Sequence, residues 1–138
     1  MKTRQLGRSG LLVSELCLGA MTFGRETPEA ESYPIMDRFV AAGGNFIDTA
    51  DVYGFGHSEE LIARLIRERG KGDLIVATKA GNDFYHASAD DDSGYGPIRQ
   101  NCDKDYLKSA AERSLKRLNV ETLDILQLHS PDLVKLER

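Results

Sequence analysis

Short apolar segments alternate with stretches of helical periodicity along most of this chain. The apolar segments predict strands at 15–20, 45–48, 73–78 and 122–128. Between them, apolar side chains recur at the spacing of one helix face at 35–40, 61–66 and 107–118. Strands that alternate with helices form parallel sheets with right-handed crossovers. The sequence therefore predicts an α/β fold in the order β-α-β-α-β-α-β.

Turn formers and helix breakers indicate where these elements begin and end. Residues 2–13 predict a hairpin with its turn at Gly7–Gly10. Ser58 is expected to cap the second helix. Residues 80–102 predict a long connection with an acidic run at 90–92, and Pro131-Asp132 predict a last turn. Connections of this length inside a compact domain are often functional.

Reactive polar groups follow three of the predicted strands. Asp48 and Tyr53 follow the second strand, Lys79 the third and His129 the fourth. The carboxyl ends of parallel strands share one rim of the sheet, and barrel enzymes build their active sites there. We therefore expect a carboxylate, a phenol, an ammonium and an imidazole to gather at one rim.

The glycine pattern distinguishes a barrel from a dinucleotide-binding sheet. A dinucleotide-binding fold carries a G-x-G-x-x-G fingerprint after its first strand. Here that position reads Gly19-Ala20-Met21-Thr22-Phe23-Gly24, and the later Gly54-Phe55-Gly56-His57-Ser58-Glu59 lacks the third glycine. The sequence thus favours barrel topology.

The four polar groups suit the reduction of a carbonyl. Tyr53 is the candidate proton donor, although a phenol with an ordinary pKa of about 10 is a poor acid at neutral pH. Lys79 would lower that pKa by placing a positive charge beside the phenol. Asp48 would hold Lys79 in place, and His129 would orient the substrate oxygen.

Simpler roles exist for each residue taken alone. Tyr53 would be an amphipathic rim residue, Lys79 a solvated one and His129 a turn cap. Metal binding is a rival for Asp48, Asp51, His57 and His129, whose oxygen and nitrogen atoms suit a hard or borderline cation. Paired-histidine spacing and a calcium-type loop are both missing from the sequence, so we expect no metal.

Composition narrows the partners and the compartment. The formal charge of -4 over 138 residues argues against nucleic acid or an anionic membrane as the main partner. No apolar run reaches the length that spans a bilayer, and no signal peptide precedes the hairpin. Cys17 and Cys102 lack metal-type spacing, which favours reduced thiols and a cytoplasmic location.

Three ordered motifs resemble the aldo-keto reductase family from Leu6 to Asp132. The segments 6–14 and 18–24 resemble its opening hairpin and first strand. Gly44-Asn45-Phe46-Ile47-Asp48-Thr49-Ala50-Asp51-Val52-Tyr53-Gly54, followed by Ser58-Glu59, is similar to its most diagnostic signature. The third motif comprises Ser114–Leu118, Asp124 and His129–Asp132.

The resemblance implies a (β/α)8 barrel that uses NADPH to reduce aldehydes or ketones. It implies that Tyr53 is the proton donor, and that Lys79, Asp48 and His129 complete the catalytic set. It also implies that the nicotinamide end of the cofactor lies against Asp48 and against the backbone of Gly19, Ala20, Met21 and Thr22. Ala63 stands where family members often carry glycine.

The chain differs from the family mainly in its length. A (β/α)8 barrel needs about 250 residues, so residues 1–138 are expected to form one partial barrel domain: the hairpin and the first four strands. We expect weak or no reductase activity from this domain alone. Two alternatives stay open: a non-catalytic module that self-associates through its open sheet edges, and an unrelated barrel enzyme such as a metal-dependent lyase or hydrolase. The sequence does not indicate which carbonyl compound is the substrate.

Overall fold

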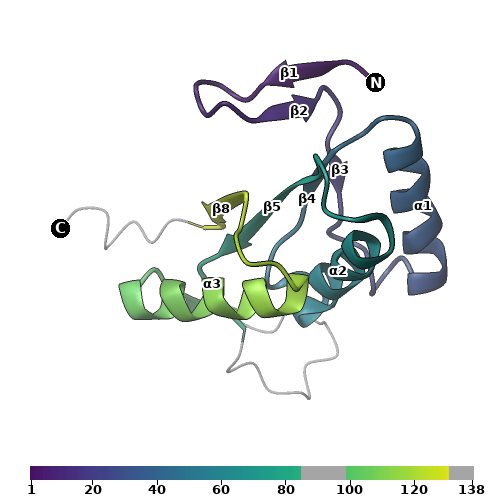
Figure 1. Cartoon of the computed structure of the whole chain (residues 1–138). Helices are drawn as coiled ribbons and strands as arrows, with labels where there is room; N and C mark the ends of the chain where they lie inside the picture. The colour runs from purple at the N-terminus through teal and green to yellow at the C-terminus, as the bar shows by residue number, and fades with distance from the viewer. Residues whose placement is uncertain (85–98, 131–138) are drawn as a thin grey trace.

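The computed structural model describes residues 1–84 and 99–130 (Figure 1). Within them, four parallel strands form a sheet in the order β3-β4-β5-β8. The strands are β3 (Leu18–Gly19), β4 (Phe46–Asp48), β5 (Ile75–Ala80) and β8 (Ile125–Leu128). The helices between them are α1 (Glu29–Ala41), α2 (His57–Arg69) and α3 (Lys104–Leu118). The predicted alternation of strands and helices is confirmed.

The register of the sheet separates two faces. Gly19 lies opposite Asp48, and Lys79 lies opposite Gln127. Side chains alternate between the faces of a strand, so Asp48 and Lys79 project from one face. Ile47, Val76 and Thr78 project from the other face and are buried. In a barrel, the first face corresponds to the interior and the second to the layer of helices.

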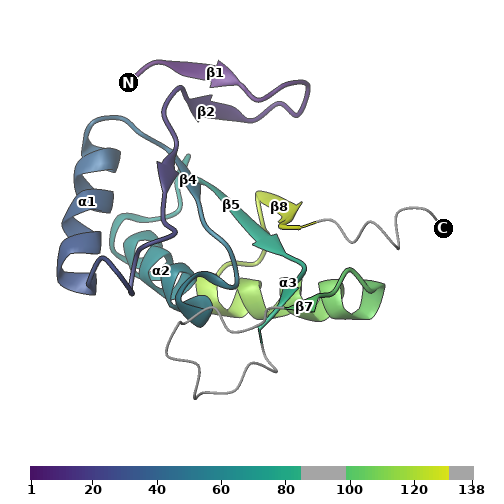
Figure 2. The ribbon, with the colours of Figure 1, turned by 180° about the vertical axis from the view of Figure 1, so that it is seen from behind.

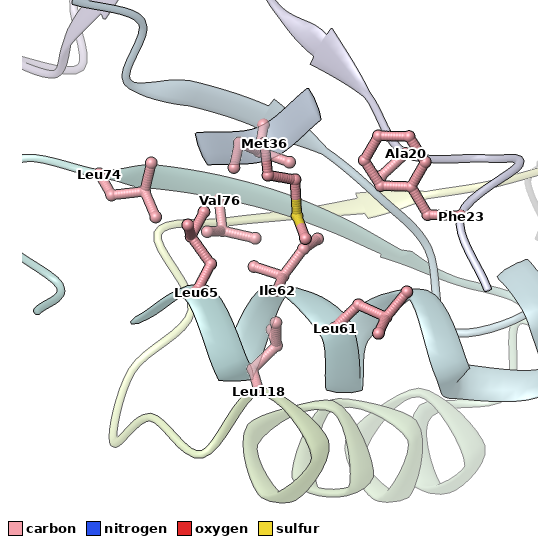
Figure 3. Packing of buried hydrophobic residues seen from close by; sticks show 10 residues of the cluster. Ala20, Phe23, Met36, Leu61, Ile62, Leu65, Leu74, Val76 and Leu118 are labelled. Carbon is pink, nitrogen blue, oxygen red and sulfur yellow. The ribbon is translucent and has the colours of Figure 1, made fainter. Parts of the chain in front are cut away.

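The hydrophobic core lies between the second face and the helices (Figure 3). Met36 of α1, Val76 of β5, and Ile62 and Leu65 of α2 belong to this core, and Leu118 of α3 packs below α2. Apolar residues of α2 recur every three or four positions and so form one buried stripe. This packing fixes the sheet and leaves the carboxyl ends of its strands free for other groups.

A hairpin made of β1 (Thr3–Gln5) and β2 (Leu12–Ser14) lies at the amino-terminal end of the sheet (Figures 1 and 2). Asn45, just before β4, holds it there. The Asn45 side chain accepts a hydrogen bond from Ser14 N at 2.7 Å and donates to the carbonyl oxygens of Leu12 and Asp73. The predicted hairpin is confirmed.

Several predicted boundaries differ from the structure. The strand predicted at 15–20 shortens to β3, and β5 ends two residues later than predicted, so that Lys79 lies within the strand. The connection predicted at 80–102 contains a short antiparallel pair, β6 (Asn82–Asp83) with β7 (Arg99–Gln100). The acidic run at 90–92 and the turn at Pro131-Asp132 lie outside the described residues.

The prediction that Ser58 caps α2 is wrong. The helix begins at His57 after Gly56, and no side chain caps its first amides. The buried Ser58 hydroxyl donates to Ala20 O at 2.8 Å and lies 2.9 Å from Thr49 Oγ1. The Ser58 hydroxyl therefore binds residues from distant parts of the chain instead of the first amides of its own helix.

Candidate active site

Tyr53 begins a tight turn that follows β4. This turn, η1 (Tyr53–Gly56), contains left-handed backbone at Gly54, Phe55 and Gly56 and leads directly into α2. Before the turn, Asp51 N donates to Lys79 O at 3.1 Å, so the chain leaving β4 stays beside the end of β5. The turn thereby places the Tyr53 ring above the strand that carries Lys79.

The Lys79 ammonium contacts both the Asp48 carboxylate and the Tyr53 hydroxyl. Its Nζ atom lies 2.6 Å from Asp48 Oδ2 and 3.4 Å from the Tyr53 hydroxyl. Nζ also donates to Thr49 O at 2.9 Å and lies 4.9 Å from the centre of the Tyr53 ring. The Lys79 side chain is 15% exposed, compared with 33% for Asp48. This limited exposure strengthens the attraction between the two charges.

His129 approaches the same group from the far strand. Its backbone nitrogen donates to Ala80 O at 2.9 Å, which continues the β5–β8 pairing beyond the end of β8. The His129 and Tyr53 rings meet edge to face with their centres 5.5 Å apart. The structure therefore brings Asp48, Tyr53, Lys79 and His129 together at one rim. We call these four residues the tetrad.

Burial and charge favour a neutral His129. Partial burial lowers the pKa of the imidazole, and the nearby Lys79 ammonium lowers it further, against an opposing effect of Asp48. The Nδ1 atom of His129 is buried and has no hydrogen-bond partner among the described residues. A neutral imidazole keeps one N–H donor and one acceptor nitrogen, so it can bind an uncharged polar substrate.

The segment predicted to contact the nicotinamide lies beside the tetrad. Gly19 pairs with Asp48, and Ala20 N donates to Asp48 O at 2.8 Å. Met21 is 52% exposed, and Thr22 Oγ1 lies 2.9 Å from Thr27 Oγ1. A Cβ atom added to Gly19 would meet no atom within 4 Å. The backbone here leaves room for a flat ring next to Asp48, which fits the nicotinamide end of the cofactor.

Three features of the site escaped the sequence interpretation. Thr49 contributes only its carbonyl oxygen, which the residue type does not reveal. Cys17, just before β3, lies near Asp48 and Lys79; burial and Asp48 raise the pKa of its thiol. Glu59, in the first turn of α2, is fully buried and pairs with Arg117. Sequence distance hides this pair, because 58 positions separate the partners.

The residues weighed as metal ligands do not form one cluster. His57 pairs with Glu60, their atoms 3.1 Å apart, on the outer side of α2. Asp51 is buried near Glu59 and Arg117, away from His57. Among residues 1–84 and 99–130, no three His, Cys, Asp or Glu side chains are arranged to hold a metal ion.

An open groove of about 880 Å³ lies between α1 and α2 near the amino-terminal end of the sheet. Its polar side chains already pair with one another: Tyr33 donates to Glu68, and Arg69 contacts Asp37. With these side chains already paired, the groove offers less chemistry than the tetrad. We assign the candidate site to the tetrad.

Comparison with known proteins agrees with the geometry. The model of the aldo/keto reductase family matches residues 15–135. The chain belongs to the aldo/keto reductase family. An aldo-keto reductase from Bacillus halodurans, solved in its holo form, superposes with a TM-score of 0.83 at 38% identity. That match covers 98% of this chain and 43% of the other, so this aldo/keto reductase chain forms part of a (β/α)8 barrel.

Curated relatives show the same partial coverage. An uncharacterized oxidoreductase of Bacillus subtilis (strain 168) is 40% identical over 129 residues, which are 94% of this chain and 39% of the relative. A probable voltage-gated potassium channel subunit beta of Oryza sativa subsp. japonica is 34% identical and matched over 38% of its length. The chain thus spans about two fifths of each. None of its described helices is long and apolar enough to cross a membrane.

Proposed function

We propose that residues 1–138 are a single partial barrel domain of an NADPH-dependent aldo-keto reductase that reduces aldehydes or ketones to alcohols. The observation that carries the proposal is the 3.4 Å separation between Lys79 Nζ and the Tyr53 hydroxyl, with Asp48 only 2.6 Å from the same nitrogen. A phenol beside an ammonium and a neutral imidazole suits proton transfer to a carbonyl oxygen. Family membership and an oxidoreductase relative support it.

In this mechanism each residue has a distinct task. The Tyr53 hydroxyl and an N–H of His129 hydrogen-bond the carbonyl oxygen and so orient the substrate. When the carbonyl carbon receives a hydride, Tyr53 passes its proton to the oxygen, and the product is an alcohol. Lys79 stabilises the phenolate that remains, and Asp48 and Thr49 hold Lys79 in position.

NADPH would supply the hydride from its nicotinamide ring. Gly19, Ala20, Met21, Thr22 and Asp48 would line that end of the cofactor, where the backbone leaves space. We assign none of the described residues to the pyrophosphate of the cofactor. We therefore expect weak cofactor affinity and weak turnover from this chain by itself.

The test is oxidation of NADPH in the presence of a panel of aldehydes, followed by the loss of cofactor absorbance. Tyr53→Phe is expected to reduce the rate at least about 100-fold, the usual contribution of a general acid. Tyr33→Phe is the matched control, because Tyr33 contacts Glu68 on α2, outside the tetrad. Turnover that persists in Tyr53→Phe would remove the phenol as the acid.

The open edge of β8 supports a second candidate function, a module that self-associates. Leu126 and Leu128 of this edge strand are 45% and 50% exposed, and a parallel edge with apolar side chains is prone to pairing. Two copies related by a twofold axis would join β8 of one copy to β3 of the other and close eight strands. Light scattering across a concentration series tests this: a constant monomer mass would eliminate the module.

A further inference from the structure

A buried carboxylate lies behind the tetrad, on the face of the sheet that the helices cover. The Glu59 side chain is fully buried. Thr78 Oγ1 donates to Glu59 Oε1 at 2.6 Å, and Arg117 Nε donates to Glu59 Oε2 at 2.5 Å. Both carboxylate oxygens therefore have a partner, and one of these partners is a cation from α3.

These contacts join the two segments that carry Lys79 and Tyr53. Thr78 immediately precedes Lys79 in β5, so Glu59 binds the strand next to the lysine. Arg117 packs against Gly56, which ends the turn that Tyr53 begins; a Cβ atom at Gly56 would lie 2.6 Å from Arg117 Cδ. One ion pair thus contacts both the strand of Lys79 and the turn of Tyr53.

Asp51 adds a second buried acid to this group. The residue is fully buried, and neither of its side-chain oxygens has a hydrogen-bond partner among the described residues. Glu59 faces it from α2, and Arg117 and Arg113 face it from α3. The two arginines of α3 offset the negative charges of this group only in part, and Arg117 is the one that contacts Glu59.

We propose that Glu59 and Arg117 are positioning residues that fix the separation between the Tyr53 hydroxyl and Lys79 Nζ. Both side chains act through the backbone, because neither reaches the rim. Ala50, Val52 and Phe84 pack together beneath the same turn. Apolar packing would therefore retain the turn without the ion pair, but the spacing between the turn and β5 would relax. The catalytic meaning of this role rests on the proposed function.

The test follows the ring of Tyr53 by NMR in the full chain, labelled with ¹³C at the Cζ atom of tyrosine. The chain has five tyrosines, and the signal missing from Tyr53→Phe identifies Tyr53. Titratable groups facing the phenol are Lys79 of β5, Asp48 of β4 and His129 beyond β8. Because a more distant ammonium stabilises the phenolate less, Glu59→Gln is expected to move the titration midpoint of the Tyr53 signal upward.

Two further variants separate positioning from general damage. Glu68→Gln removes an exposed carboxylate of α2 that pairs with Arg64, and it should leave the Tyr53 midpoint unchanged. Thr78→Val removes only the hydroxyl donor to Glu59 and should move the midpoint in the same direction as Glu59→Gln, by less. If Glu59→Gln does not fold, Thr78→Val and Arg117→Lys decide the question.

The outcomes are distinct. An unchanged Tyr53 midpoint in folded Glu59→Gln, or in both milder variants, overturns the proposal. The proposal is also overturned if Glu68→Gln moves the Tyr53 midpoint as much as those variants do. The effect would then not be specific to the buried pair. The readout needs no turnover: a specific shift in a chain that never oxidises NADPH would uphold the positioning role while the proposed reductase function fails.

Discussion

Lys79 has three ammonium protons and three oxygen acceptors within 3.4 Å. Asp48 Oδ2 is the nearest, Thr49 O comes next and the Tyr53 hydroxyl is the most distant. This order indicates a division of tasks, because the two shorter contacts hold the nitrogen in place. The longer contact is the one that changes in strength when the phenol becomes a phenolate.

Asp51 gives a residue-level prediction about pH. Burial, together with the neighbouring Glu59, raises the pKa of its carboxyl to about 7, against an unfolded value of 3.8. The folded state thus binds this proton more tightly, so the stability that the group contributes is complete below about pH 4 and is lost as the pH rises through 7.

Asp51→Asn removes this titration. Relative to the parent chain, the variant should therefore gain stability between pH 4 and pH 8, by on the order of 4 kcal/mol at 1.36 kcal/mol per pKa unit. Urea unfolding of both proteins at the two pH values measures the difference. If the two proteins differ in free energy of unfolding by the same amount at both pH values, the raised pKa of Asp51 is contradicted.

At the level of elements, the turn between β4 and α2 depends on Gly56. Its φ of +96° is a left-handed conformation, and its bare Cα packs against Arg117. Gly56→Ala should cost about 1–2 kcal/mol from backbone strain alone, and more because Arg117 must move. Gly10→Ala is the control, since Gly10 has a φ of +84° but no atom within 4 Å of an added Cβ. Equal losses in urea unfolding would show that the contact with Arg117 is unimportant.

The same elements show what the sequence could predict. Periodicity gave the order of strands and helices, and the rule that parallel strands share one rim predicted that Tyr53 and Lys79 would meet. Periodicity did not fix the end of β5, because residues on both faces of this strand are buried and the strand shows no strict alternation. Local rules placed Ser58 as a cap, but its hydroxyl is used by Ala20 and Thr49 from distant parts of the chain. Such tertiary partners leave no local signal.

At the scale of the whole molecule, the sheet has one covered face and one uncovered face. Helices and the apolar core cover the side of Ile47 and Val76. The other side carries Asp48 and Lys79, and β3 and β8 are its unpaired edges within the described residues. If two copies associate through these edges, Leu128→Asp should shift the light-scattering mass toward the monomer, because a charge would enter the joined strands. Leu12→Asp, in the hairpin, is the matched control.

Asn45 holds the hairpin at the beginnings of β4 and β5. The hairpin therefore lies at the amino-terminal end of the sheet (Figure 2), whereas the tetrad lies at the carboxyl ends of the strands. Any molecule attached to the Gly7–Gly10 turn of the hairpin would stay remote from an incoming carbonyl compound. A reporter dye or an affinity handle inserted there should leave the chemistry untouched, which makes this turn the natural place to immobilise the protein.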